Sequence, residues 1–271
     1  MRLATARRPD GGTTALRVDG DHAVPLDAPD AVSALQAGVA DAASGDAVPL
    51  AEVDLAPVVP RPPKIICLGL NYESHIRELG RELPSHPTCF AKFAVALTGP
   101  HDDLVLPAIS SKVDYEAELA VVIGAPARHV AESEAHEIIA GYTVLNDISM
   151  RDFQNRTTQW LQGKTFERST PLGPVLVTGD EIDHARDLAI SCAVDDEVRQ
   201  SARTSDMVFA PPFVVSYLSR IMTLEPGDVI STGTPGGVGI SYRPSRYLRP
   251  GQVVRTRIEG IGELVNACVA A

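Results

Sequence analysis

From Ile65 onward the sequence consists mainly of short β-branched segments separated by glycine and proline. Such segments are typical of β-strands. Strands and helices do not alternate regularly along the chain, so the βαβ units of a parallel sheet are not expected. The segments are ELAVVIG, IAGYTVLND, GPVLVTG, LAISCAVDDEV, GDVISTGTP and QVVRTRIEGIGELVNACV. The sequence therefore predicts a mainly β fold with a few helices, of the α+β class, in which 211–227 forms an amphipathic helix.

The N-terminal part of the chain has a different residue pattern. The segment TTALRVDGDHAVPL predicts two short strands that turn at Asp19 and Gly20. The segment DAPDAVSALQAGVADAASG then predicts a helix that ends at Gly45. A stiff, proline-rich stretch, APVVPRPPK, follows and is the best candidate boundary. We therefore predict a small N-terminal α/β domain over 1–60 and a larger domain over 61–271.

Charge and composition exclude several classes of partner. The formal net charge is −11 and no basic block is present, so nucleic acid is not an expected partner. No window approaches the length and hydropathy of a membrane span, and the N-terminus lacks an apolar signal region. The four cysteines, Cys67, Cys89, Cys192 and Cys268, have neither zinc-ligand nor redox-motif spacing. A cytoplasmic protein with reduced cysteines is the expectation.

Two carboxylates lie within a segment that is otherwise suited to burial, KVDYEAELAVVIG. In a strand, Glu116 and Glu118 project to the same side. Two like charges so close require a compensating cation, or one of them must stay protonated. A hard divalent cation such as Mg²⁺ or Mn²⁺ meets this need with oxygen ligands. The alternative is a strand face exposed to solvent, which is the commoner meaning of an isolated Glu-x-Glu.

A third carboxylate is available at the end of a later apolar segment, GYTVLNDISMRDFQ. Asp147 comes where the strand gives way to a loop, a place where functional groups are common. Asp152 is an alternative, although it stands in the polar run that follows. Three oxygen ligands would leave coordination positions open for water and substrate, as a catalytic metal site requires.

A histidine and a glutamate stand three residues apart in NYESHIRELG, a predicted short helix that Asn71 caps and Gly80 ends. His75 and Glu78 then share one face and can form a hydrogen bond. A carboxylate fixes the tautomer of an imidazole and raises its basicity, so the pair is a candidate general base for water. The alternative is a surface ion pair without a catalytic role.

Two further segments carry polar groups suited to an anionic ligand. Lys164 in WLQGKTFERSTPLGP is flanked by apolar and turn residues, and it could bind a carboxylate or an enolate oxygen; most lysines are simply solvent-exposed. The glycine-rich STGTPGGVG lacks the ending of a Walker loop and the spacing of a dinucleotide fingerprint. Its backbone amides and Thr234 could instead approach a small anion.

Six blocks of the sequence together resemble the signature blocks of the fumarylacetoacetate hydrolase family. In chain order they are GLNYESHIREL, KVDYEAELAVVIG, AGYTVLNDISMRDFQ, GKTFERSTPLGP, MTLEPGDVISTGTPGGVG and IEGIGEL. The resemblance runs from about Pro63 to the C-terminus, and its nearest kinds are the acylpyruvases and the 2-hydroxyhepta-2,4-diene-1,7-dioate isomerases. It implies a mixed β-roll core, a variable N-terminal piece and a homodimer.

The resemblance also implies roles for particular residues. The implied metal ligands are Glu116, Glu118 and Asp147, for Mg²⁺ or Mn²⁺ with Ca²⁺ as an alternative. The implied catalytic residues are His75 and Glu78, on a lid helix, and Lys164. The implied substrate-binding residues are Lys92, Arg151, Gln154 and Thr234. The implied substrates are small 2-oxo and 1,3-dioxo acids.

On this basis the leading hypothesis is hydrolytic cleavage of a C–C bond in an acylpyruvate-like 1,3-dioxo acid, such as a fumarylacetoacetate or fumarylpyruvate. His75, oriented by Glu78, would deprotonate the attacking water, and the metal would serve as the electron sink with help from Lys164. The alternatives on the same site are isomerisation of a 2-hydroxydienoate and decarboxylation of a β-oxo acid. An alternative of another class is a non-catalytic module that binds a metal or ligand.

Overall fold

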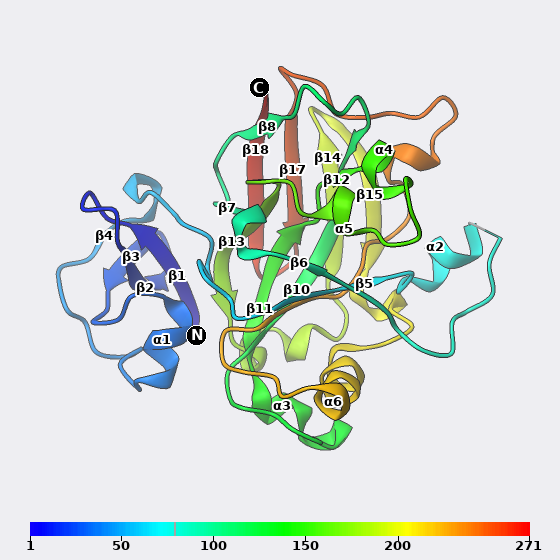
Figure 1. Cartoon of the computed structure of the whole chain (residues 1–271). Coiled ribbons are helices and arrows are strands. Elements are labelled where there is room, and N and C mark those ends of the chain that lie inside the picture. Colours follow the sequence, from blue (N-terminus) through cyan, green and yellow to red (C-terminus); the bar gives the residue numbers. More distant parts are fainter. Residues whose placement is uncertain (79) are drawn as a thin grey trace.

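The computed structural model describes residues 1–78 and 80–271 and contains two large β-sheets (Figure 1). The larger is an eleven-stranded mixed sheet. Its strands, in spatial order, are β4 (Val48–Pro49), β3 (His22–Pro25), β2 (Thr13–Asp19), β1 (Arg2–Arg7), β13 (Thr170–Val177), β11 (Ile139–Asn146), β10 (Ala117–Ile123), β16 (Val229–Ser231), β5 (Ile65–Gly69) and β6 (Thr88–Lys92), with β7 (Leu97–Thr98) paired to β13 off this path. Most pairs are antiparallel, while β16 with β5 and β13 with β7 are parallel.

The second sheet has five strands and packs against the first through contacts of β14, β17 and β18 with β10, β11 and β13. In spatial order its strands are β15 (Glu197–Arg203), β14 (Ala189–Val194), β17 (Val253–Ile258), β18 (Gly262–Ala270) and β8 (Leu104–Leu106). A two-stranded pair joins β12 (Ser149–Met150) to β9 (Val113–Asp114). The helices are α1 (Ala31–Gln36), α2 (Glu73–Glu78), α3 (Ala135–Ile138), α4 (Arg151–Gln154), α5 (Leu161–Lys164) and α6 (Pro211–Ile221). The mainly β, α+β fold predicted from the sequence is thereby confirmed.

Strand β10 lies at the centre of the fold, and all of its residues are buried. Its side chains enter two different hydrophobic cores, Leu119 and Val121 on one side and Ala120 and Val122 on the other. Both faces of β10 are covered, which explains why its sequence is a continuous apolar run without polar alternation. By the same alternation Glu118 lies on the side of Ala120, inside the protein.

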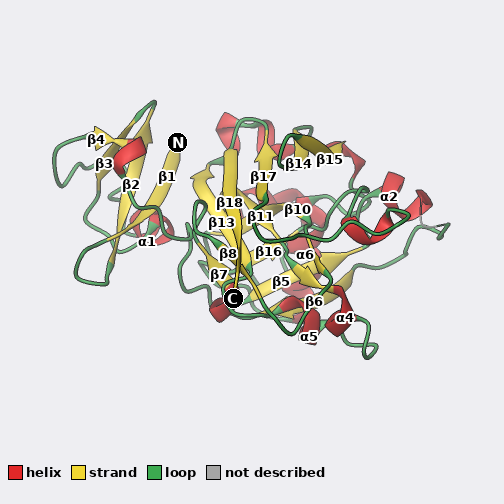
Figure 2. Ribbon diagram, turned by 90° about the horizontal axis from the view of Figure 1, so that it is seen from above, coloured by secondary structure: helices red, strands yellow, loops and turns green. Residues whose placement is uncertain are grey.

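The N-terminal strands β1 to β4 and helix α1 lie beside the main body and not over it (Figures 1 and 2). The predicted hairpin is confirmed, because β2 and β3 pair with Asp19 opposite His22. Helix α1 is shorter than predicted: it ends at Gln36 and not near Gly45, and Gly38 follows with a φ of +66°. Strand β1 pairs with β13 and so joins this unit to the main sheet. The proposed domain boundary at residue 60 stays a prediction.

Helix α2 lies on the opposite side of the molecule from the N-terminal strands (Figure 1). The prediction that Asn71 caps it is wrong, because the amide of Asn71 bonds to the backbone of Phe209 and Thr232. The first turn is instead capped by Asp206, which accepts from the amide and hydroxyl of Ser74. Gly80 has a φ of +66°, in keeping with its predicted place after the helix. Leu79, which the prediction also included, lies outside the described residues.

Helix α6 confirms the amphipathic helix predicted over 211–227, although it ends at Ile221. Val214 and Leu218 are buried as the spacing requires, whereas Ile221 is 57% exposed at the last turn. No helix among the described residues is long and apolar enough to cross a membrane. The homodimer stays a prediction.

Candidate active site

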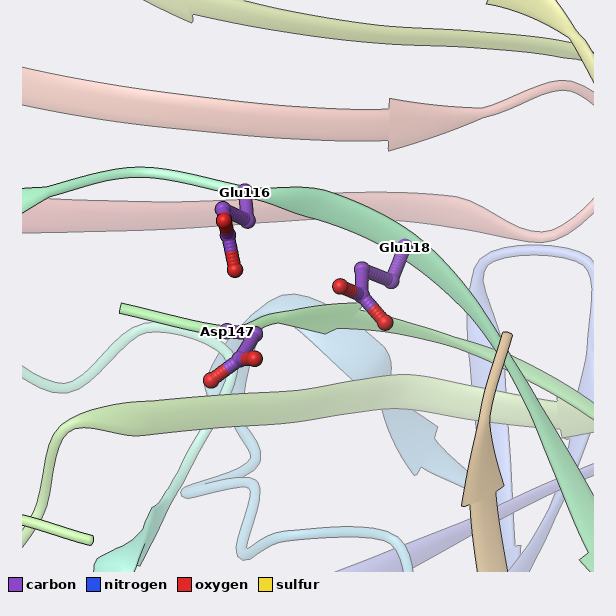
Figure 3. A group of neighbouring side chains, drawn as sticks. All are labelled: Glu116, Glu118 and Asp147. Carbon is purple, nitrogen blue, oxygen red and sulfur yellow. The ribbon is translucent and has the colours of Figure 1, made fainter. Parts of the chain in front are cut away.

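Three buried carboxylates meet beside the centre of the large sheet (Figure 3). One oxygen from each of Glu116, Glu118 and Asp147 lies within 4.8 Å of the others. Glu118 belongs to β10, Glu116 immediately precedes that strand, and Asp147 immediately follows β11. Strands β10 and β11 are antiparallel neighbours, and the amide of Asp147 donates to the carbonyl of Glu116 at 2.9 Å. The pairing of these two strands therefore brings together residues about thirty positions apart in the chain.

Regular strand structure is interrupted between β9 and β10, where Glu116 lies. Amide side chains accept hydrogen bonds from the backbone N–H groups there. The Glu116 amide donates to Asn146 Oδ1 at 2.9 Å, and the Ala117 amide donates to Gln200 Oε1 at 2.9 Å. The side-chain nitrogen of Asn146, Nδ2, donates to Thr256 Oγ1 at 2.9 Å. Buried backbone donors need partners, so these two amide side chains hold the glutamates in place. Neither Asn146 nor Gln200 could be identified from sequence, because their partners come from distant strands.

Three buried cations surround the carboxylates. Lys164 Nζ bonds to Glu116 Oε2 and, at 2.7 Å, to Asp147 Oδ2. Lys92 Nζ bonds to Asp147 Oδ1 at 2.5 Å, and Arg151 Nη2 bonds to Glu116 Oε1 at 2.7 Å. Removing one partner of such a pair would leave an uncompensated buried charge, at a cost of roughly 3–5 kcal/mol. The carboxylates of Glu116 and Asp147 are thus held in one orientation.

The protein pushes the pKa values of the two glutamates in opposite directions. Burial raises the pKa of Glu116, but Arg151 and Lys164 outweigh it and hold this pKa far below its usual range. Burial also raises the pKa of Glu118, and the nearby charges of Asp147 and Glu116 raise it further. Glu118 accepts hydrogen bonds from Ser231 Oγ at 2.5 Å and from the Gly233 amide at 2.9 Å. These bonds aim its carboxylate toward the other two.

The chemistry of this donor set fits a hard divalent cation. All three candidate ligands are carboxylate oxygens. Mg²⁺, Mn²⁺ and Ca²⁺ prefer such ligands, whereas softer metals select nitrogen or sulfur. The structure brings Asp147 into the cluster, whereas Asp152 accepts from Ser110 Oγ at 2.7 Å elsewhere. The site can therefore bind a divalent metal ion.

His75 of helix α2 lines the same cavity as Glu116 and Glu118. His75 Nδ1 lies 3.2 Å from Glu78 Oε2, and the two side chains are 10% and 52% exposed. The cavity has a volume of about 260 Å³, and His75, Glu116, Glu118 and Lys164 all line it. The pair is therefore not an isolated surface ion pair: its imidazole reaches the space above the carboxylates.

The remaining predicted residues divide between the cavity wall and the layer behind it. Gln154 and Thr234 line the cavity, as does Arg151, which also bonds to Gln154 Oε1 at 2.8 Å. Lys92 is not among the lining residues: its ammonium lies behind Asp147. The wall also includes apolar and basic groups that the sequence did not single out, namely Phe90, Trp160, Val238, Ile240 and Arg81.

Comparison with known proteins supports the fold and identifies related proteins. The family model described as fumarylacetoacetate (FAA) hydrolase C-terminal matches residues 64–269. The human mitochondrial protein named oxaloacetate tautomerase FAHD2A is 44% identical over 224 residues, which cover 82% of this chain and 71% of that protein.

Two solved structures from Mycobacterium smegmatis cover the whole of this chain and match over their own full length. One, described as a putative HpcE protein, has a TM-score of 0.89 at 37% identity. The other, described as 5-carboxymethyl-2-hydroxymuconate delta-isomerase, has a TM-score of 0.83 at 35% identity. These similarities confirm the predicted β-roll fold.

Proposed function

This chain belongs to the fumarylacetoacetate hydrolase family, and from that premise we propose that it is a metal-assisted isomerase of a small 2-oxo dicarboxylic acid. The reaction is the interconversion of the enol and keto forms. The human relative is named an oxaloacetate tautomerase and one structural neighbour a hydroxymuconate isomerase. Both names denote isomerisation, which moves a proton and cleaves no C–C bond. Hydrolytic cleavage, the leading hypothesis from the sequence, becomes the second candidate.

The observation that carries this proposal is the position of the His75 imidazole. Its Nδ1 lies beside the Glu78 carboxylate, which can only accept, so Nδ1 carries the proton. The lone pair is then on Nε2, and the ring borders the cavity that Glu116 and Glu118 also line. An imidazole held in this way can remove a proton from the carbon beside a 2-oxo group and return it. Glu78 stabilises the positive ring that forms in between.

Glu116, Glu118 and Asp147 would hold a divalent cation, which would supply positive charge to stabilise negative charge on the oxygens of a 2-oxo acid. Lys164 keeps an ammonium at the cavity wall, and its pKa is raised: burial lowers it, but the charges of Asp147 and Glu116 outweigh burial. The lysine is therefore charged at neutral pH, and it adds a second positive centre beside the acid cluster.

The test is to offer oxaloacetate, in its enol form, with Mg²⁺ or Mn²⁺ and to follow loss of the enol absorbance. In D₂O, the proton at the carbon beside the oxo group should exchange faster with the protein than without it. Replacing His75 by Ala should remove both effects. No acceleration with oxaloacetate or with longer 2-oxo diacids, by protein that binds the metal, would overturn the proposal and favour a non-catalytic binding module.

Hydrolysis of an acylpyruvate is the second candidate, because the same His75–Glu78 pair could deprotonate a water molecule. It is distinguished by its products: hydrolysis releases two fragments and incorporates solvent oxygen into one of them, whereas isomerisation does neither. Decarboxylation of a β-oxo acid is recognised by release of CO₂, and it should largely survive the change His75→Ala. One product analysis on a panel of 2,4-dioxo acids and oxaloacetate therefore separates all three reactions.

The metal, assembly and location belong to the same proposal. We expect Mg²⁺ or Mn²⁺ in the acid cluster and a homodimer in solution, which calorimetric titration and light scattering would test. The cytoplasmic location stays a prediction; the human relative is named as mitochondrial.

A further inference from the structure

A fully buried glutamine from the second sheet contacts the cavity loop and the metal-binding strand at the same time. Gln200 lies on β15 and has no exposed surface. Its Nε2 donates to Thr234 Oγ1 at 2.8 Å and to the Pro235 carbonyl at 2.9 Å. Its Oε1 accepts from the Ala117 amide, between the two metal-site glutamates. One side chain therefore links three segments of the site.

The orientation of the Gln200 amide is determined by its partners. A backbone amide can only donate, so the group facing Ala117 N is the oxygen of Gln200. A carbonyl can only accept, so the group facing Pro235 O is the nitrogen. A flipped amide would break both bonds at once. Gln200 must therefore present an N–H to Thr234, and Thr234 Oγ1 must accept.

This arrangement determines what Thr234 can offer to a ligand. One lone pair of its hydroxyl is used by Gln200, and the hydroxyl proton remains. Among the residues that the structure describes, Thr234 Oγ1 donates that proton to none, while Thr234 lines the cavity. The hydroxyl is thus available as a donor to whatever occupies the cavity.

The loop that carries Thr234 is also pressed directly against β15. A Cβ built on Gly237 would lie 2.0 Å from the Arg199 carbonyl oxygen, and Gly237 has a φ of +93°. Any larger residue would lift the loop from the strand. Strand β15 therefore sets the distance between Thr234 and the glutamates, as a supporting layer does for a rigid site.

We propose that Gln200 is a positioning residue that fixes Thr234 as a hydrogen-bond donor into the cavity, so that the substrate presents a carboxylate oxygen at this point. An ionised acceptor gains most from such a donor. A neutral substrate hydroxyl at the same place would gain less from this donor than a carboxylate oxygen does. The identity of the ligand as a 2-oxo acid rests on the proposed function, whereas the role of Gln200 rests on the hydrogen bonds.

The change Gln200→Glu tests this with almost no change of shape. The new carboxylate still accepts from the Ala117 amide, but it cannot donate. The bond to the Pro235 carbonyl is therefore lost, and the Thr234 hydroxyl turns toward the carboxylate and away from the cavity. The probe is oxalate, a small dianion with the paired oxygens of a 2-oxo acid, titrated calorimetrically into protein in excess Mg²⁺. We expect Gln200→Glu to weaken oxalate binding about tenfold or more.

The double variant Gln200→Glu/Thr234→Ala separates the loss of the Thr234 hydroxyl donor from the effect of added negative charge on oxalate binding. Thr234→Ala alone should also weaken oxalate about tenfold, and Gln200→Glu should then cause little further loss in that background. An equal loss in both backgrounds, or wild-type affinity in Gln200→Glu, would overturn the role of Gln200. Failure of the wild-type protein to bind oxalate would overturn the carboxylate assignment.

Two additional measurements distinguish a loss of oxalate binding from a loss of the fold. Thermal unfolding of the metal-free variants shows whether Gln200→Glu retains the fold. If Gln200→Glu does not fold, the variants Thr234→Val and Thr234→Ser test the donor role of Thr234, because only serine keeps the hydroxyl. We expect Thr234→Val to lose oxalate affinity and Thr234→Ser to keep it. Equal affinities in these two variants contradict the proposal. Turnover of oxo acids is measured separately, so a failure of the proposed reaction does not affect this result.

Discussion

The acid cluster and the histidine–glutamate pair both contribute side chains to one cavity but are built in opposite ways. The carboxylates come from strands at the centre of the protein, are at most 7% exposed, and have two or more recorded partners each. The pair comes from α2, a helix of six residues in which only His75 and Ile76 are buried. Glu78 is 52% exposed. One half of the site is rigid, and the other is held by few contacts.

The contrast suits the proposed chemistry. Charge stabilisation requires groups that do not reorganise, and buried strand residues with fixed partners provide them. Short helices with little buried surface are the part of a protein that opens most easily, and a cavity that admits substrate needs such a part. The comparison predicts that changes in the cluster abolish metal binding, whereas changes around α2 affect turnover alone.

The largest expected effect comes from the change Glu118→Gln in the rigid half. Glutamine keeps an oxygen that can accept from Ser231 and Gly233, so the metal-free protein should unfold within about 1 kcal/mol of the wild type. The neutral amide is a much poorer ligand for Mg²⁺ or Mn²⁺. We expect metal affinity to fall at least about a hundredfold and turnover at least about a thousandfold. Calorimetry with Mn²⁺ and denaturant unfolding check the two parts, and unchanged metal affinity would remove Glu118 from the metal site.

The next largest effect comes from His75→Ala in α2, the half of the site that is held by few contacts. We expect kcat to fall roughly a hundred- to ten-thousandfold, because proton transfer loses its base. Metal affinity should stay at the wild-type value, since the recorded partner of His75 is Glu78 and not a ligand carboxylate. The matched variant Glu78→Gln still accepts from Nδ1 but lacks charge, so a smaller loss, about tenfold, is expected. A loss of metal affinity in His75→Ala would show that the two halves are not separate.

These two halves also differ in how far the sequence predicted them. The spacing of Glu116 and Glu118 and the place of Asp147 after an apolar strand predicted a shared cation site, because strand alternation is a local property. The supports of the site were not predictable. Asn146 and Gln200 act through partners that only the pairing of distant strands brings near.

The helix shows a second limit of the sequence. The segment was recognised from local composition, yet its cap was assigned to Asn71, the nearest residue of a suitable type. The actual cap, Asp206, is 132 positions away from Ser74. The length of α1 was also wrongly predicted. Val32, Leu35 and Val39 have helical spacing, but the helix ends at Gln36, and Gly38 then takes a positive φ. Local patterns predict elements, and tertiary contacts decide their ends.

A smaller effect is expected from Gly236→Ala, which acts on the pair from the neighbouring loop. A Cβ at this position would lie 2.7 Å from Glu78 Oε2 and 3.5 Å from His75 Nδ1. Glu78 is the exposed, flexible end of the pair, so it should swing away at little cost in stability. We expect kcat to fall about tenfold while the melting temperature changes little. Gly45→Ala, where the new methyl meets only Pro25 at 3.5 Å, is the matched control and should leave kcat unchanged.

The smallest effect is expected from Asp206→Ala, which removes the cap of α2 and touches nothing in the acid cluster. Asp206 accepts from the Ser74 amide at 3.2 Å and from its hydroxyl at 2.5 Å. Loss of a cap costs about 1 kcal/mol, and here it falls on one short helix. Backbone hydrogen exchange over 73–78 should therefore become several-fold faster, while the midpoint of thermal unfolding moves by less than about 4 °C.

A matched control exists for this last variant in the same surface region. Asp187 is exposed, whereas Asp206 is half-buried; it accepts from the Ser205 hydroxyl at 2.7 Å, as Asp206 does from that of Ser74, but it has no recorded bond to α2. Asp187→Ala should leave exchange in α2 at the wild-type rate. If both variants accelerate exchange equally, the helix is not held by its cap but by the general stability of the surface. The acid cluster and α2 would then open together, and the division of the site into a rigid half and a half held by few contacts would fail.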